Sequence, residues 1–103
     1  MKRYQIRILP EAEEQLNAIR AWWRRNRREH PDLVREELAE AVRTLASFPG
    51  AGVEHRARGR GPMRKLLLPR SQYHVFYRVF ADESAVEIFA VWRTSRGKGP
   101  PIP

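Results

Sequence analysis

The segment MRKLLLPRSQYHVFYRVFADESAVEIFAVW, residues 63–92, decides the fold. It contains three apolar runs, at 63–68, 72–80 and 85–92, each of a length typical of a β-strand. The connecting segments PRSQ and ADES have turn-forming residues, so the three runs predict an antiparallel meander. Alternation along the middle run divides its side chains between two faces, with Tyr73, Val75, Tyr77 and Val79 on one and His74, Phe76, Arg78 and Phe80 on the other.

The sequence before this segment predicts one strand followed by a helix. Residues 4–9 alternate between apolar and polar side chains, which indicates a strand. Pro10 and the glutamates behind it are typical of a helix start. Four side chains recur at helical spacing and predict the buried stripe of this helix: Ala12, Leu16, Ile19 and Trp23.

A second helix is predicted to start at Pro31 or just before it and to end at the segment SFPGAG, residues 47–52. The short connection predicts that the two helices form an antiparallel hairpin. The expected buried stripe consists of Val34, Leu38, Ala41, Val42 and Leu45. The segment GVEHRARGRGP, residues 52–62, is predicted to be a basic loop or a poorly ordered edge.

These elements predict an α+β fold with the order β-α-α-β-β-β. The amphipathic helical hairpin must bury its apolar stripes, so we expect it to cover one face of an antiparallel sheet. The other face would carry the basic side chains and remain in contact with water.

Length and composition exclude several classes of protein. A chain of 103 residues predicts one domain. The absence of cysteine excludes disulfide scaffolds and thiol catalysis, and it favours a cytoplasmic location. The N-terminus has no signal-peptide pattern, and no apolar run approaches the roughly 20 residues that span a membrane. Neither a metal nor another cofactor is expected, because the histidines at 30, 55 and 74 lie in separate predicted elements.

The positive charge is concentrated in two parts of the chain. The net charge is +8, and residues 54–70 contain six Lys or Arg against one Glu. Residues 93–98 contain three further cations and no acid, whereas acids balance the arginines across residues 11–48. A focused basic surface favours nucleic acid or an acidic protein surface as partner. The alternative is an arginine-rich surface that serves only solubility.

The candidate functional residues are therefore cationic. On adjacent antiparallel strands they can converge on one patch, consisting of Arg64, Lys65, Arg78, Arg93 and Arg96. Guanidinium groups bind phosphate or carboxylate with two parallel hydrogen bonds and could also stabilise the transition state of metal-free RNA cleavage.

Two further side chains on the strands have two interpretations each. His74 is the best candidate for the proton acceptor of an RNA cleavage reaction, but a histidine at such a position is more often a surface or half-buried strand residue. Trp92 could stack on a base, whereas an aromatic residue in a short strand is more often part of the core.

Five motifs in order resemble the RelE/ParE toxin superfamily of type II toxin–antitoxin systems: PEAEEQLNAI, AVRTLASFPGAG, MRKL, YHVFYRV and VEIFAVWRTSR. The resemblance covers nearly the whole chain and implies a RelE-like toxin domain over residues 1–96. It implies a cytoplasmic toxin that a cognate antitoxin neutralises in a hetero-oligomer, often in the service of plasmid stabilization. Residues 97–103, GKGPPIP, are expected to be a flexible tail.

The superfamily contains two activities, and the sequence is closer to the ParE branch, whose members inhibit DNA gyrase. Arg64 and Arg96 match recurrent arginines of that branch. Arg93 stands where many relatives have a histidine, and arginine cannot act as a general base. We therefore predict a gyrase inhibitor rather than an enzyme, with a target-binding set of Arg64, Lys65, Arg78, Trp92, Arg93 and Arg96.

Two alternatives remain. The first is a RelE-like, metal-independent mRNA endonuclease that acts on the ribosome. If the chain is such a nuclease, the candidate catalytic residues are Arg64, Lys65, His74, Arg78, Arg93 and Arg96. The second is a non-toxic relative that only interacts with its antitoxin.

Overall fold

The structure is a computed structural model and describes residues 2–56, 59 and 61–93. Its elements are, in order, β1 Gln5–Ile8, α1 Pro10–Asn26, α2 Leu33–Ser47, β2 Val53–His55, β3 Met63–Leu68, β4 Tyr73–Phe80, the 3-10 turn η1 Ala81–Glu83 and β5 Ala85–Trp92. The α+β class, both helices and the three C-terminal strands confirm the prediction. Arg96 and the predicted tail at 97–103 lie outside the described residues.

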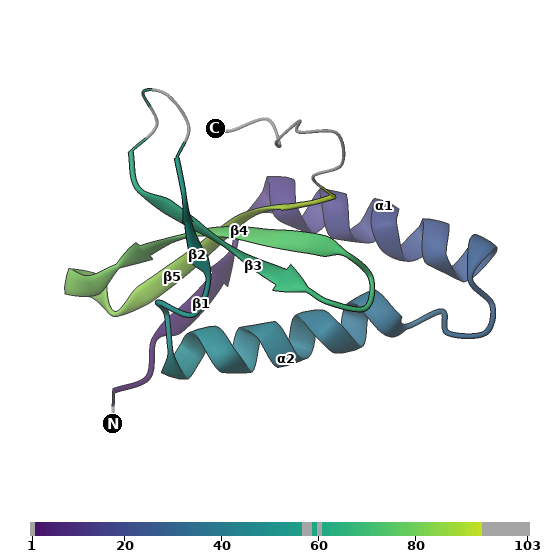
Figure 1. The fold of residues 1–103 in the computed structure, drawn as a ribbon, viewed down its shortest axis with the longest axis horizontal. Helices are drawn as coiled ribbons and strands as arrows, with labels where there is room; N and C mark the ends of the chain where they lie inside the picture. The colour runs from purple at the N-terminus through teal and green to yellow at the C-terminus, as the bar shows by residue number, and fades with distance from the viewer. Residues whose placement is uncertain (1, 57–58, 60, 94–103) are drawn as a thin grey trace.

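The strands form one five-stranded sheet with the order β1-β5-β4-β3-β2 (Figure 1). Strands β3, β4 and β5 form the predicted antiparallel meander. The sheet differs from the prediction in being mixed, because β1 pairs in parallel with β5, with Gln5 opposite Ala85 and Ile8 opposite Ile88. No tight turn joins β1 to β5, so the connection does not impose the antiparallel direction.

The additional strand β2 forms the edge of the sheet beyond β3. It lies in the segment that was predicted to be a basic loop or a poorly ordered edge, and it pairs with β3 through Glu54 opposite Arg64. Its start is fixed by the buried Tyr77, whose hydroxyl accepts a hydrogen bond from the Gly52 N–H at 2.8 Å and donates one to the Pro49 carbonyl at 2.8 Å. The three residues of β2 have no apolar pattern of their own. Their position depends on the hydrogen bond between Gly52 and Tyr77, which lie 25 residues apart in the sequence.

The two helices run in opposite directions across one face of the sheet, as predicted (Figure 1). Within the expected stripes, Ala12, Leu16, Trp23, Val34, Ala41 and Leu45 are buried, while Ile19, Leu38 and Val42 are half-buried against the same core. Helix α2 begins at Leu33 rather than at Pro31, with Asp32 at its N-cap position. Among the described residues, no helix is both long and apolar enough to cross a membrane.

An acidic side chain inside α2 holds the β3–β4 turn against the helix. Glu37 is buried, and its carboxylate accepts hydrogen bonds from the backbone N–H groups of Arg70 at 2.8 Å and Ser71 at 3.0 Å. Charge-assisted hydrogen bonds of this kind offset the cost of removing a carboxylate from water. In the same turn, Gln72 adopts a left-handed backbone conformation with φ of 69°.

The face of the sheet away from the helices is here called the open face. It was predicted to remain wet, but part of it is a second apolar cluster in which Met63, Phe76, Phe89 and Ala90 are buried. Leu9 and Trp92 pack against this cluster. The prediction was wrong in this respect, because the aromatic side chains on β4 and β5 pack against one another and exclude water from the middle of the face.

Candidate target-binding surface

Strand register brings four of the predicted site residues to the open face. Lys65 on β3 is opposite the buried Phe76, His74 on β4 is opposite Trp92, and Arg78 is opposite Glu87. Side chains of directly paired residues project to the same side of a sheet. The open face therefore combines cationic and aromatic side chains drawn from three adjacent strands.

Arg64 does not join this group. Its register partner is Tyr77, which is part of the core beneath the helices, so the Arg64 side chain projects to the helical side of the sheet. There its guanidinium donates hydrogen bonds to the Gly52 carbonyl at 2.7 Å and the Gly50 carbonyl at 3.4 Å. Arg64 is separated from Lys65 because neighbouring residues of a strand face opposite sides of the sheet. Its hydrogen bonds hold the connection between α2 and β2.

Arg78 lies over the aromatic cluster of the open face. Its guanidinium carbon is 4.5 Å from the centroid of the Phe89 ring, a cation–π geometry. The facing carboxylate of Glu87 bonds instead to Arg7 at 3.2 Å, and Arg7 also bonds to Glu83 at 2.8 Å. Arg78 therefore has no ion pair within the described part of the chain, and its charge is available to a partner.

Two histidine rings flank Phe76 on the open face. The ring centroids of His55 and His74 lie 5.1 and 6.1 Å from that of Phe76. Burial, together with the charge of Lys65, lowers the pKa of both imidazoles, and His55 adds to the lowering of the pKa of His74. Both rings are consequently neutral at neutral pH and able to accept a proton.

His55 was not among the predicted site residues, because its segment was predicted to be a basic loop or a poorly ordered edge. The one indication in the sequence was that Val53 and His55 are two positions apart, as residues on the same face of a strand are. A segment of three residues is too short for this spacing to predict a strand. Pairing of β2 with β3 is what carries His55 to the open face.

These lowered pKa values predict that acid weakens the fold. A histidine in the unfolded chain titrates near its ordinary value of about 6.5, above the values of the folded protein. Above about pH 6.5 both histidines are neutral in the folded and in the unfolded chain, and their contribution to the free energy of unfolding is complete. As the pH falls below this value, the unfolded chain binds protons more readily than the folded protein, so this contribution is progressively lost. We expect the melting temperature, measured by circular dichroism, to fall between pH 7.5 and 5.5. The double variant His55→Gln, His74→Gln should show a shallower dependence, and identical slopes would refute this assignment.

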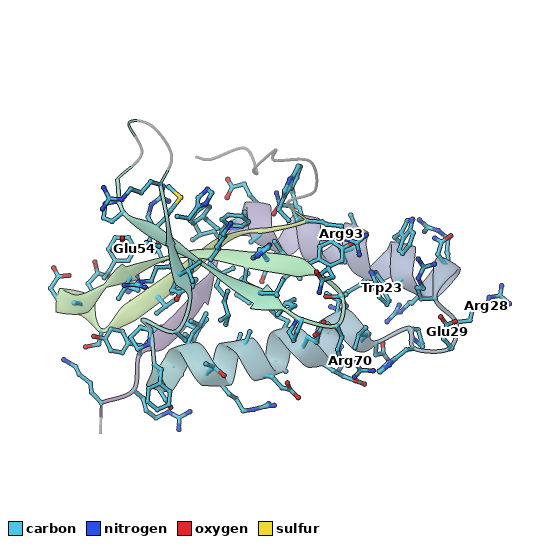
Figure 2. All side chains as sticks on the ribbon, in the orientation of Figure 1. Trp23, Arg28, Glu29, Glu54, Arg70 and Arg93 are labelled. Atoms are coloured by element: carbon cyan, nitrogen blue, oxygen red, sulfur yellow. The ribbon has the colours of Figure 1, made fainter. Side chains whose placement is uncertain are left out.

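Arg93 lies at the end of the sheet rather than in the middle of the open face. Its guanidinium donates a hydrogen bond to the Ser71 carbonyl at 2.8 Å and lies 4.8 Å from the Tyr73 ring centroid. It lines a pocket together with Arg70 and Trp23, and Figure 2 shows these three labelled side chains at the same end of the molecule. His74 also lines this pocket, so the pocket adjoins the open face.

Trp92 contributes to two surfaces. It is half-buried against the aromatic cluster of the open face, and it lines an apolar groove of about 260 Å³ between α1 and β5. Ala18 and Ile19 form part of the helical wall of this groove. At its base, the Val91 N–H donates a hydrogen bond to the side-chain oxygen of Gln15 at 2.8 Å.

The described residues offer little for metal chemistry. No group of three or more His, Asp or Glu side chains within residues 2–56, 59 and 61–93 is arranged to hold a metal ion. What the open face can supply is positive charge, aromatic surface and neutral imidazole.

Comparisons with known proteins agree with this fold. A family model described as "ParE toxin of type II toxin-antitoxin system, parDE" matches residues 6–97. No curated protein matches the sequence.

Several solved structures share the fold at low sequence identity. The chromosomal ParDE toxin–antitoxin system from P. aeruginosa matches with a TM-score of 0.67 and 20% identity, covering 87% of this chain and 95% of that one. The isolated E. coli RelE toxin matches with a TM-score of 0.61 and 21% identity, covering 90% and 86%. The archaeal RelE–RelB complex from Pyrococcus horikoshii OT3 matches with a TM-score of 0.59 and 14% identity, covering 90% and 97%.

Proposed function

Because the chain belongs to the family of ParE toxins of type II toxin–antitoxin systems, we propose that it acts by binding DNA gyrase and inhibiting it. The open face is the proposed contact surface. Lys65 and Arg78 provide its charge, and Trp92, opposite His74, provides an aromatic anchor on the same face. Aromatic side chains and arginine are enriched in protein interfaces, where they contribute much of the binding energy.

The observation that supports a binder over a nuclease is the separation of the predicted arginines. Arg64 projects to the helical side, Arg78 stacks on Phe89, and Arg93 bonds to the Ser71 carbonyl at the end of the sheet. Cleavage of a phosphodiester requires donors that converge on one developing charge. The predicted arginines do not converge in this way, whereas Lys65 and Arg78 around the apolar centre of the open face suit an extended protein surface.

Inhibition of supercoiling by the purified toxin tests this proposal. The double variant Lys65→Gln, Arg78→Gln should require about tenfold more protein than the unchanged chain to inhibit gyrase, because charged contacts control association. The matched control is Arg24→Gln, Arg25→Gln, which removes the same charge from exposed positions on α1 and should leave inhibition unaltered. An unchanged topoisomer pattern at excess toxin would exclude gyrase as the target.

A ribosome-dependent mRNA endonuclease is the second candidate, favoured by the neutral rings of His55 and His74 beside Lys65. Such rings could accept and return a proton during RNA cleavage without a metal. Primer extension on translated mRNA would reveal codon-phased cuts, and their loss in His74→Gln would assign the reaction to this face. Their absence from the unchanged chain would exclude this candidate.

A cognate antitoxin is the proposed partner in the cell, and a gyrase target would place the pair in the cytoplasm. The apolar groove between α1 and β5 fits a strand or helix of such an antitoxin, because Ile19, Tyr73 and Trp92 offer it a partly exposed apolar surface. The net charge of +8 favours an acidic partner. Failure of the purified toxin and its antitoxin to associate would contradict this part of the proposal.

A further inference from the structure

Three segments that are distant in sequence enclose a pocket at one end of the sheet, with a volume of about 510 Å³. Here it is called the arginine pocket. Its lining includes Trp23, Arg27, Arg70, Ser71, His74 and Arg93. The end of α1, the β3–β4 turn and the end of β5 each contribute one arginine, and Figure 2 labels two of these arginines and Trp23.

The three arginines are positioned by contacts that include no direct ion pair with a carboxylate. Arg27 lies 5.0 Å from the ring centroid of Trp22. Arg70 meets the Nδ1 atom of His30 at 3.2 Å, and the Nε2 atom of this ring lies 3.0 Å from the Glu36 carboxylate, so Arg70 is linked to an acid only through the imidazole. Arg93 bonds only to a backbone carbonyl and stacks on an aromatic ring. Within the described residues none of the three forms an ion pair, so their positive charges add up at the pocket.

The buried acid of this region does not neutralise them through an ion pair. Both carboxylate oxygens of Glu37 accept hydrogen bonds from backbone N–H groups, those of Arg70 and Ser71. The carboxylate therefore holds the turn that carries Arg70, and both of its oxygens bond to backbone N–H groups rather than to an arginine side chain.

Two buried polar atoms in the lining residues have no hydrogen-bond partner among the described residues. They are the indole Nε1 of Trp23 and the hydroxyl Oγ of Ser71, in residues that are 7% and 2% exposed. A buried donor without an acceptor is unfavourable, so native structures usually satisfy it. Both atoms are shielded from solvent, so a ligand with several acceptor oxygens would satisfy them once the covering side chains move aside, while neutralising the arginines.

We infer that the arginine pocket binds the phosphate group of a small phosphate ester of nucleoside monophosphate size. Arginines from three separate segments can bond to a tetrahedral oxyanion with three terminal oxygens, whereas a planar carboxylate offers two. The volume exceeds what a free phosphate ion fills and lies within the range of small-molecule sites. Arg93 and His74 also belong to the sets proposed for gyrase binding or RNA cleavage, so the variants that test this ligand are made at Arg27 and Arg70, which belong to neither set.

Nuclear magnetic resonance of the indole N–H groups provides the test on the full chain. The protein has three tryptophans, at 22, 23 and 92, and only Trp23 has its Nε1 among the unsatisfied buried atoms of the described residues. Titration with adenosine monophosphate should shift the Trp23 signal saturably, with the largest change of the three. Adenosine alone, or sodium chloride at the same ionic strength, should leave that signal in place.

Variants separate a specific site from general attraction of anions. Arg27→Gln and Arg70→Gln should each raise the dissociation constant for adenosine monophosphate about tenfold, whereas the exposed control Arg24→Gln should not change it. Both Arg27 and Arg70 are exposed, so neither variant is expected to impair folding. Trp23→Phe, checked by thermal melting, should weaken binding by removing the indole donor.

Two probes distinguish the source of the phosphate. Orthophosphate should bind more weakly than adenosine monophosphate if the nucleoside also contacts the pocket. Tighter binding of a short oligonucleotide with a 5′-phosphate than of its 5′-hydroxyl form would assign the site to the end of a nucleic acid. No shift up to about 10 mM adenosine monophosphate, equal shifts of all three indoles, or unchanged affinity in Arg70→Gln would overturn the inference.

Discussion

Replacing Gly52 with alanine is expected to lower the free energy of unfolding by about 2 to 5 kcal/mol. A Cβ atom at this position would lie 2.6 Å from the carbonyl oxygen of Lys65 and 2.7 Å from the hydroxyl of Tyr77. One obstacle is the backbone of β3, and the other belongs to a fully buried ring, so neither can move without disturbing the sheet or the core. A protein of this size has a total stability of roughly 5 to 15 kcal/mol, which makes this a large effect.

The cost has two parts that act at the same place. Overpacking alone costs typically about 1 to 3 kcal/mol. In addition, moving the Tyr77 hydroxyl weakens its hydrogen bonds with the Gly52 N–H and the Pro49 carbonyl, and each buried polar group left unpaired costs about 1 to 3 kcal/mol. Since the Arg64 guanidinium also bonds to the Gly52 carbonyl, the start of β2 loses its position.

Gly50→Ala is the matched control, because a Cβ atom at Gly50 meets nothing within 4 Å. Thermal melting of both variants should separate them by roughly 10 °C or more for a domain of this length. Equal melting temperatures would show that the chain relaxes around a side chain at position 52 at no cost.

Replacing Glu37 with alanine is expected to cost about 2 to 4 kcal/mol, the second large effect. The carboxylate is the acceptor for two backbone N–H groups, those of Arg70 and the buried Ser71. Its removal leaves these donors facing the apolar space of the deleted side chain. Because the β3–β4 turn then loses its hydrogen bonds to α2, we also expect faster amide exchange at these two residues, measured by hydrogen–deuterium exchange.

Glu40→Ala removes an exposed carboxylate one turn further along the same helix and should change stability by less than about 0.5 kcal/mol. Chemical denaturation of both variants gives the comparison directly. If the two substitutions have the same effect, the hydrogen bonds of Glu37 do not hold the turn.

Most of the fold could be predicted from the sequence because its elements have strong local patterns. The apolar stripes of α1 and α2 follow the helical period, and β3 and β5 were predicted with their observed boundaries. The parallel pairing of β1 with β5 could not be predicted, because it depends on where the helical hairpin returns the chain and not on any local pattern. Strand β2 escaped prediction because its three residues contain no periodic signal and pair only through β3.

The candidate site was less predictable than the fold. The run MRKLLL does not alternate between polar and apolar residues, so the pattern cannot decide which of Arg64 and Lys65 faces the helices. Pairing of Arg64 with the buried Tyr77 decides it in the structure. Arg27, Arg70 and Arg93 come together because three segments that are distant in sequence meet at one end of the sheet. Their spacing in the sequence does not predict this proximity.

The position of β5 has a consequence for the synthesis of the protein. β5 is the last strand of the described chain, yet it lies between β1 and β4, and it is the strand to which β1 is paired. While the ribosome has not yet released β5, β1 has no strand to pair with, and Val86 and Ile88 are missing from the core. Long-range pairing of this kind forms late, after the intervening chain is available. The nascent chain therefore cannot complete its fold until translation has passed Trp92. An antitoxin that is made during this time is already present when the toxin first reaches its folded state.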